Sequence, residues 1–242
     1  MLPLNKEDIV VFNLSGEYAH YSHPATNYSS LTYPIPTKTS IMGLLGAIVG
    51  LDTYDELNDI RYSVSMDNEL VKKEYQFNGI LKALSSNLRL KEGYQRSDEK
   101  KQFKRELVCN PSYTIYLDIS KLEVPLKSKI KDYIKNHKSH YGICMGINTF
   151  HADFENIEIE SFSKCEEDEM IVTSLASLNS FIFDIKNPSK ITNMRFALNI
   201  ESKERIFSNF QDFVIEISGK QKILAKNNNN IYLINNKGIC FV

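Results

Sequence analysis

Cysteine is scarce in this chain of 242 residues, and its four cysteines are scattered. Cys109, Cys144, Cys165 and Cys240 include no pair at the close spacing of a zinc-ligand motif. They also give no disulfide framework, and isolated thiols are typical of a reducing compartment. We therefore expect a cytoplasmic protein without a zinc site or disulfides.

Long apolar runs are also absent. The longest, residues 41–51, is about half of the roughly 20 residues that a membrane-spanning helix needs. Residues 1–8 contain no apolar core of a signal peptide. We therefore expect no membrane association.

Several catalytic motifs are missing as well. The sequence has no Walker phosphate-binding loop, no zinc-protease helix, no paired metal carboxylates and nothing typical of Ser-His-Asp chemistry. We expect no metal and no cofactor. A metal-independent ribonuclease would need an acid, a base and a cation. Candidates for these roles are Tyr18, His20, His23, Lys38, His137, Lys138 and His140.

The net charge of -1 hides a strong segregation of charge. Residues 82–105 hold eight Lys or Arg against three acids, a local charge of +5, and residues 121–138 hold six Lys against two acids, +4. Residues 153–169 hold eight acids against one Lys, -7. The basic blocks favour a polyanionic partner, whereas we interpret the acidic block as a solvated face.

The order of predicted elements indicates an α+β fold. Residues 9–14, 62–66, 113–119 and 143–147 read as strands, and residues 39–51 and 125–138 read as helices. This gives β-α-β, an insertion, and a second β-α-β, the ferredoxin-like order that RNA-recognition (RRM) domains share. We assign it to residues 1–154. Residues 155–242 predict a small antiparallel β-domain, with hairpins at 218–220 and 235–238.

The insertion at about 68–112 predicts a long hairpin, which we call the thumb. Its expected arms are residues 74–80 and 103–108, and its tip is basic. A loop at residues 16–36, which we call the aromatic loop, follows the first strand and carries Tyr18, His20, Tyr21 and His23. Aromatic rings beside cations suit single-stranded nucleic acid, because bases stack on rings and phosphates pair with cations. The alternative is that these tyrosines are half-buried lids and that the insertion is a solvated loop.

The helix expected at 39–51 contains Gly43, Gly46 and Gly50. Glycine costs a helix up to ~1 kcal/mol relative to alanine, so we expect something to approach these positions closely. For Gly46 and Gly50 we favour packing. For the helix start, with Lys38 and nearby hydroxyls, we favour contact with an anion. The candidate RNA-binding residues are Tyr18, His20, Tyr21, Tyr33, Lys38, Thr39, Ser40, Gly43, Arg89, Lys91, Arg96, Lys100, Lys101, Lys104 and Arg105.

Residues 12–21 (FNLSGEYAHY) and 32–50 (TYPIPTKTSIMGLLGAIVG) resemble the N-terminal signature of the CRISPR-associated Cas family five, within the RAMP superfamily. The form that they resemble most occurs in type I-B effector complexes. The resemblance implies a ferredoxin-like (RRM/RAMP) domain with a thumb hairpin. It also implies a non-catalytic, CRISPR RNA-binding subunit of the Cascade complex in antiviral defence.

Such a subunit caps the backbone filament and holds the 5′ handle of the CRISPR RNA. Its implied partners are the backbone subunit (Cas family seven), the large subunit (Cas family eight) and target DNA near the protospacer-adjacent motif. A sibling branch in type I-C systems cuts precursor CRISPR RNA with a Tyr-Lys-His set. That set has no residue-by-residue match here, so we expect no catalysis, with a metal-independent endoribonuclease as the alternative.

Overall fold

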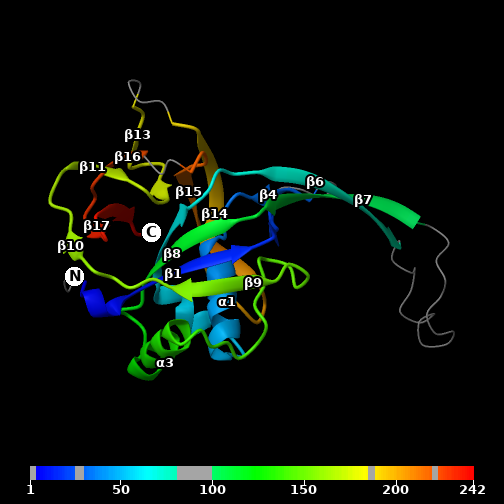
Figure 1. The fold of residues 1–242 in the computed structure, drawn as a ribbon, viewed down its shortest axis with the longest axis horizontal. Coiled ribbons are helices and arrows are strands. Elements are labelled where there is room, and N and C mark those ends of the chain that lie inside the picture. The colour runs from blue at the N-terminus through cyan, green and yellow to red at the C-terminus, as the bar shows by residue number, and fades with distance from the viewer. Residues whose placement is uncertain (1–3, 25–29, 81–99, 185–188, 220–222) are drawn as a thin grey trace.

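The computed structural model describes residues 4–24, 30–80, 100–184, 189–219 and 223–242. Its central element is a four-stranded antiparallel sheet in the order β5-β8-β1-β9. The strands are β1 (Ile9–Gly16), β5 (Arg61–Met66), β8 (Ser112–Asp118) and β9 (Ala152–Asn156). Helices α1 (Lys38–Val49) and α3 (Val124–Lys135) lie beside each other on one face of this sheet (Figure 1). The chain is a mixed α+β protein, as the sequence predicts.

Helix α1 begins where two prolines end an extended segment. The Tyr113 hydroxyl donates a hydrogen bond to the Pro34 carbonyl (2.7 Å), and the buried Tyr62 hydroxyl donates to the Pro36 carbonyl. Thr37 then caps the helix, because its Oγ1 accepts a hydrogen bond from the Ser40 N–H at 3.3 Å. These contacts tie the start of α1 to strands β5 and β8.

The second face of the central sheet is covered by the C-terminal hairpin. Strands β17 (Ile231–Ile234) and β18 (Lys237–Cys240) form this hairpin, which the sequence predicts at 235–238. Its side chains form one buried cluster with the outer face of the sheet: Ile9, Val11, Tyr116, Tyr232, Ile234, Ile239 and Phe241. RNA-recognition domains stack bases on an open sheet face. The hairpin occupies much of that face in this protein.

The predicted thumb hairpin is present. Strands β6 (Lys72–Ile80) and β7 (Lys100–Cys109) pair along their whole length, from Lys72 opposite Val108 to Ile80 opposite Lys100. The ribbon leaves the body of the molecule and extends to one side (Figure 1). Strand β2 (Tyr18–Ala19) pairs with its base, which joins the thumb to the aromatic loop.

The remaining strands build two further sheets and a short hairpin. A six-stranded sheet contains β10 (Phe162–Lys164), β11 (Glu169–Val172), β13 (Phe181–Ile182), β16 (Ile223–Lys226), β17 and β18. A three-stranded sheet contains β12 (Ala176–Ser177), β14 (Ile191–Glu201) and β15 (Ile206–Glu216). Strands β3 (Tyr21–Ser22) and β4 (Thr32–Tyr33) pair with each other. Two short 3-10 helices are η1 (Lys6–Asp8) and η2 (Asp55–Asp59).

The prediction of a strand at residues 143–147 is wrong. The fourth strand of the sheet is β9, and residues 143–147 instead form a turn against the aromatic loop. The His20 N–H donates to the Met145 carbonyl (3.0 Å), and Gly146 has a φ of +86° that a strand does not allow. Ile143 and Met145 are buried in this turn, which explains why their sequence pattern resembles that of a strand.

The hairpin predicted at 218–220 is also wrong. Strand β15 pairs with β14 and β12, whereas β16 lies between β11 and β13. The Ser218 N–H donates to the Glu216 carboxylate at 2.8 Å, and residue 220 lies outside the described residues. One pair in the C-terminal region, β11 with β18, is parallel. The expectation of an antiparallel region is therefore wrong for this pair, whose long connection permits parallel pairing.

The division at residue 154 stays a prediction. The largest hydrophobic cluster contains side chains from the central sheet and helices together with Leu175, Met194, Phe196 and Phe213. Residues on the two sides of the predicted boundary therefore share one core. Within the described residues, no helix is long and apolar enough to cross a membrane.

Candidate nucleic-acid interface

One face of the thumb carries a row of aromatic rings beneath an arginine. The Phe77 ring stacks between Tyr75 (6.0 Å between ring centres) and Phe103 (5.5 Å). The Arg105 guanidinium lies 5.0 Å from the centre of the Phe77 ring, and Tyr75 is 54% exposed. Stacked rings with a cation match the chemistry that binds single-stranded nucleic acid. We call these four residues the thumb ring row. Arg105 was predicted from the sequence, whereas the three rings were missed, although they alternate along two strands.

The opposite face of the thumb carries ion pairs. Lys104 Nζ lies 2.9 Å from the Glu74 carboxylate, and both side chains are more than half exposed. Exposed pairs of this kind contribute at most about 1 kcal/mol, so the lysine can exchange its partner for a phosphate at little cost. Lys104 is therefore available to an anion in spite of its ion pair.

The other predicted thumb cations fall at or beyond the described end of the ribbon. Lys100 and Lys101 lie on β7, opposite Ile80 and Gly79. The predicted contacts at Arg89, Lys91 and Arg96 lie outside the described residues.

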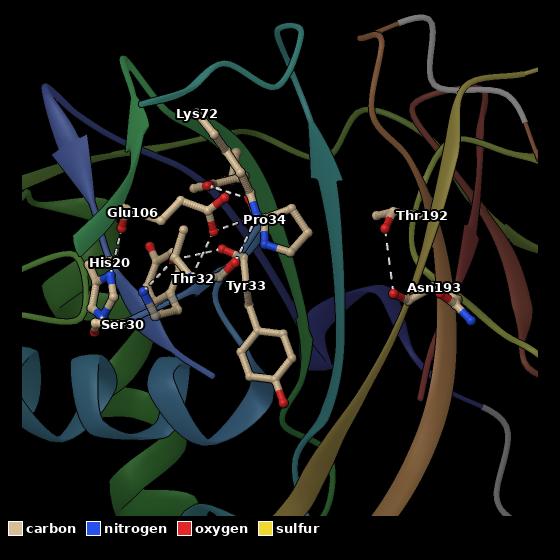
Figure 2. Close-up of polar contacts among 11 residues, drawn as sticks. His20, Ser30, Thr32, Tyr33, Pro34, Lys72, Glu106, Thr192 and Asn193 are labelled. Atoms are coloured by element: carbon tan, nitrogen blue, oxygen red, sulfur yellow. Dashed lines mark hydrogen bonds and ion pairs between the residues drawn. The ribbon is translucent and has the colours of Figure 1, made fainter. Parts of the chain in front are cut away.

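Glu106 joins the base of the thumb to the aromatic loop (Figure 2). Its carboxylate accepts hydrogen bonds from the Thr32 N–H (3.0 Å) and from Lys72 Nζ (3.0 Å), and Lys72 also donates to the Thr32 carbonyl (2.9 Å). The Glu106 N–H donates to the Ser30 carbonyl at 2.9 Å. These bonds connect β4, β6 and β7, so they fix the direction in which the thumb leaves the body.

His20 belongs to the same network and is 1% exposed. Its Nδ1 lies 2.8 Å from the Glu106 carbonyl oxygen, and its Nε2 lies 2.9 Å from Ser30 Oγ. Because a carbonyl only accepts, Nδ1 carries the proton and Nε2 accepts from the hydroxyl. Burial lowers the pKa of His20 below 6.5 and keeps the ring neutral. The ring thus presents no exposed edge for the RNA contact predicted from its loop position.

The predicted tyrosine contacts divide by burial. Tyr21 and Tyr33 are each 4% exposed, and the Tyr33 hydroxyl donates to the Arg195 carbonyl at 2.5 Å. Burial raises the pKa of Tyr33. These two tyrosines are therefore buried more deeply than the half-buried alternative considered for the loop expects. Tyr18 is 42% exposed, and its ring lies 6.1 Å from that of Phe150, so Tyr18 remains accessible to a base.

The cation predicted at the start of α1 points into the protein. Lys38 is 5% exposed, and its Nζ donates to the Asn58 carbonyl at 2.7 Å. Burial lowers the pKa of Lys38 to about 8. The predicted direct contact between Lys38 and RNA is therefore blocked in this conformation. Thr39 and Ser40 are half-buried and line the cleft described below.

The three glycines of α1 have three different environments. Gly50 ends the helix in the left-handed conformation, with φ +70° and His140 against it. A Cβ at Gly46 would lie 3.4 Å from Tyr54, in ordinary packing contact. A Cβ at Gly43 would meet no atom within 4 Å, so this position faces open space. The structure thus agrees with packing at Gly46 and Gly50.

A cleft of about 520 Å³ lies against α1. Its wall is made of the aromatic loop, the turn at residues 142–146, helix α1 and the outer half of β14–β15. The lining residues used below are Thr39, Ser40, Gly43, Arg205, Phe207 and Phe210. The last three residues were also missed from the sequence, because their hairpin lies far along the chain from α1.

The candidate catalytic residues near the end of α3 have several different partners. His137 Nε2 lies 2.7 Å from Asp153 Oδ1 and lowers the pKa of that carboxyl, whereas Lys138 pairs with Asp132 at 3.2 Å. The His140 ring lies against Tyr141, with ring centres 4.5 Å apart. Within the same residues, no group of three or more His, Cys, Asp or Glu is placed to hold a metal ion.

Comparison with known families identifies the chain. Residues 9–170 match the family model Cas_Cas5d, described as CRISPR-associated protein (Cas_Cas5). Because this match spans more than half of the chain, the protein belongs to the Cas5 family of CRISPR-associated RAMP proteins. The family resemblance at residues 12–21 and 32–50 is therefore confirmed. No curated protein matches the sequence.

A solved structure with a TM-score above 0.5 shares the fold at low sequence identity, and two others align at lower scores. A chain of a "CRISPR RNA-guided surveillance complex" aligns with a TM-score of 0.53 and 14% identity, covering 86% of this chain and 90% of that one. A "Cas protein" aligns with a TM-score of 0.49 and 13% identity, covering 88% of this chain and 98% of that one. A chain of the "Type III-B Cmr-beta" complex, bound to cognate target RNA and AMPPnP, aligns with a TM-score of 0.49 and 12% identity, covering 89% of this chain and 86% of that one.

Proposed function

We propose that this protein binds CRISPR RNA as a subunit of an RNA-guided surveillance complex. The observation that carries the proposal is the thumb ring row, in which Arg105 lies over the stacked rings of Tyr75, Phe77 and Phe103. Membership in the Cas5 family supports CRISPR RNA as the ligand. In such a complex, base pairing by the guide reads the target sequence, while the protein holds the RNA backbone.

In finer detail, we propose a cytoplasmic type I-B Cascade subunit that performs no catalysis. It would cap the backbone filament and hold the 5′ handle beside the backbone subunit and the large subunit, near the protospacer-adjacent motif of target DNA. The support is the signature at residues 12–21 and 32–50. We also classify the central sheet, with α1 and α3, as ferredoxin-like from its β-α-β-β-α-β order.

A matched pair of tyrosine variants tests the RNA-binding role. Tyr75 and Tyr141 are each 54% exposed, but only Tyr75 belongs to the thumb ring row. Base stacking contributes roughly 1–3 kcal/mol per base, so we expect Tyr75→Ala to weaken binding of the repeat-derived 5′ handle by about 5-fold to 150-fold. Tyr141→Ala should bind like the wild type. Equal affinities of the two variants would contradict stacking on the thumb.

Salt dependence tests the charged part of the proposal. For a single strand, each phosphate that a cation neutralises adds about 0.7 to the slope of log affinity against log salt concentration. We therefore expect Arg105→Gln to reduce this slope by about 0.7. Neutralising Arg89, Lys91, Lys100, Lys101, Lys104 and Arg105 together should reduce it much further. An unchanged slope in the combined variant would remove the thumb from the proposal.

The second candidate function is a metal-independent endoribonuclease that processes precursor CRISPR RNA. It is favoured by the name of the matched family model, Cas_Cas5d, which is the type I-C branch. Labelled repeat RNA, incubated in chelator with excess protein, distinguishes the two functions. We expect intact RNA. A discrete cut that is lost in His137→Ala or His23→Ala would overturn the non-catalytic assignment.

Copurification of the chain with CRISPR RNA, the backbone subunit and the large subunit would support the assembly role.

A further inference from the structure

The cleft beside α1 has an unusual charge composition for a surface cavity. No Asp or Glu is among the described residues that line it, and Arg205 is the lining residue with a permanent positive charge. Thr39 and Ser40 contribute hydroxyl groups from the first turn of α1. An aromatic and hydroxyl-lined cavity with one cation suits a ligand that combines a flat ring with an anionic group.

Two exposed aromatic side chains stand over this cleft from strand β15. Phe207 is 48% exposed and Phe210 is 44% exposed, and both line the cleft. Their strand pairs with β14 at this point, where Phe207 lies opposite Ile200 and Phe210 opposite Ala197. Strand β14 packs beside α1. The hairpin therefore holds two partly hydrated rings next to the helix.

The helix side of the cleft is left open by Gly43. A Cβ at this position would have no atom within 4 Å, whereas a Cβ at Gly46, one turn later, would contact Tyr54. Glycine in a helix interior lowers helix stability relative to alanine, so the packing of this protein alone gives no reason for it. A ligand that lies flat against the helix backbone gives one.

We propose that this cleft receives a single unstacked nucleotide of the bound RNA. Its base would lie between the Gly43 segment of α1 and the rings of Phe207 and Phe210, and its phosphate would pair with Arg205. The inference rests on the proposed function, because it takes RNA as the ligand. It goes further by assigning a base-sized site to β14–β15, which lies beyond the residues 9–170 that the family model matches.

A nucleotide explains this cleft better than a peptide segment does. A volume of about 520 Å³ is within the range of small-ligand sites, roughly 300–1,000 Å³. Base stacking on aromatic rings accepts any base, and an arginine beside the rings supplies the phosphate contact. The exposed end of the hairpin carries both kinds of group within residues 205–210.

The test uses the full chain and a series of handle RNAs, each with the fluorescent base 2-aminopurine at one position. A base that leaves the stack of its neighbours should brighten, so we expect a rise of several fold at one position and little change at adjacent ones. Overall affinity is measured separately with an end-labelled handle. The two measurements together distinguish an empty cleft from a general failure to bind RNA.

Three pairs of variants locate the signal. Gly43→Leu should fill the cleft without disturbing the fold, so its melting temperature should be at least that of the wild type while the 2-aminopurine rise is lost. Gly43→Ala adds only a methyl group against the helix, so it should reduce the rise, but by less than Gly43→Leu does. Arg205→Gln should weaken the rise, unlike the neighbouring Lys203→Gln. The Phe207→Ala/Phe210→Ala double variant should abolish it, unlike Phe183→Ala, whose ring is 68% exposed elsewhere.

The outcomes separate the two proposals. If the wild type binds no handle RNA, the proposed function fails and this inference fails with it. If RNA binds tightly but Gly43→Leu retains the full 2-aminopurine rise, only the cleft inference is overturned. Tight binding of free AMP, abolished in Gly43→Leu while the RNA signal persists, would assign the cleft to a free nucleotide and overturn the inference. If a partner subunit binds wild type but not Gly43→Leu, and RNA binding is equal in both, the cleft is a protein-docking site and the inference is overturned.

Discussion

The Nδ1 atom of His20 lies 2.8 Å from the main-chain carbonyl oxygen of Glu106, so a buried imidazole connects the aromatic loop to the thumb. Its second nitrogen is occupied by Ser30, and the Glu106 carboxylate holds Thr32 and Lys72 (Figure 2). A long two-stranded ribbon is only marginally stable by itself. The network at its base therefore determines how firmly the thumb ring row is held relative to the body of the protein.

Replacing His20 should destabilise the fold. His20→Ala leaves the Glu106 carbonyl and the Ser30 hydroxyl without their imidazole partner, and an unsatisfied buried polar group costs about 1–3 kcal/mol. We expect the free energy of unfolding in urea to fall by about that amount. His151→Ala, at an exposed histidine, is the control and should change it little. Loss of RNA affinity in His20→Ala with unchanged stability would mean that the imidazole contacts RNA.

The same residue should make stability depend on pH. The pKa of His20 is lowered by burial in the folded state, so the unfolded chain binds more protons as pH falls below about 6.5. His20 therefore contributes a loss of stability on acidification through that window. We expect His20→Gln to show a weaker fall than the wild type in thermal melts between about pH 7.5 and pH 5.5. Identical profiles would show that the ring is not buried as the structure has it.

Lys38 should act on stability and leave RNA binding unchanged. Burial lowers its pKa to about 8 in the folded state from the ordinary value of 10.5, so the unfolded chain binds more protons between these values. Stability from this residue therefore rises as pH increases from about 8 to 10.5, and Lys38→Met should remove that rise. Handle affinity and its salt slope should match those of the exposed control Lys129→Met. A smaller salt slope in Lys38→Met alone would restore Lys38 as a phosphate contact.

The C-terminal hairpin should be required for stability. Phe241 is 2% exposed and packs with Ile9, Val11 and Tyr116 on the outer face of the central sheet. A buried Phe→Ala substitution costs about 3–5 kcal/mol, so Phe241→Ala should lower the free energy of unfolding by that amount. The exposed Phe183→Ala should change it by less than about 0.5 kcal/mol. A gain in RNA affinity when Phe241 is removed would indicate that the covered sheet face binds RNA.

Local sequence patterns predicted the elements whose structure depends on near neighbours. The segments 74–80 and 103–108 indicated the two arms of the thumb, and residues 34–50 indicated the start and end of α1. The turn at 142–146 shows where this reasoning failed, because Ile143 and Met145 are buried by contact with the aromatic loop. Alternate residues are buried both in a strand of a sheet and in a turn that packs against a loop. The sequence pattern is the same in both cases, so only the fold shows which of the two structures is present.

For the candidate site, the sequence predicted which kinds of residue are present, but it did not predict which of them are exposed. The sequence indicated an aromatic loop and a basic thumb, but it did not show that His20, Tyr21 and Lys38 point inward. It also gave no sign that Phe207 and Phe210 reach the helix that carries Gly43, since hydrophobic residues in a strand most often belong to the core. Exposure depends on contacts between residues that are distant in the chain.

The amino-acid order alone was enough to determine the Cas5 family, the mixed α+β class and the thumb ribbon. These follow from short-range patterns: caps, alternation and a local signature. Only the tertiary structure decided that residues 231–241 cover the sheet face near Ile9, and that strand β15 and helix α1 share one cleft. The reason is that burial and cavity shape are properties of packed surfaces, and packing joins segments from opposite ends of the chain.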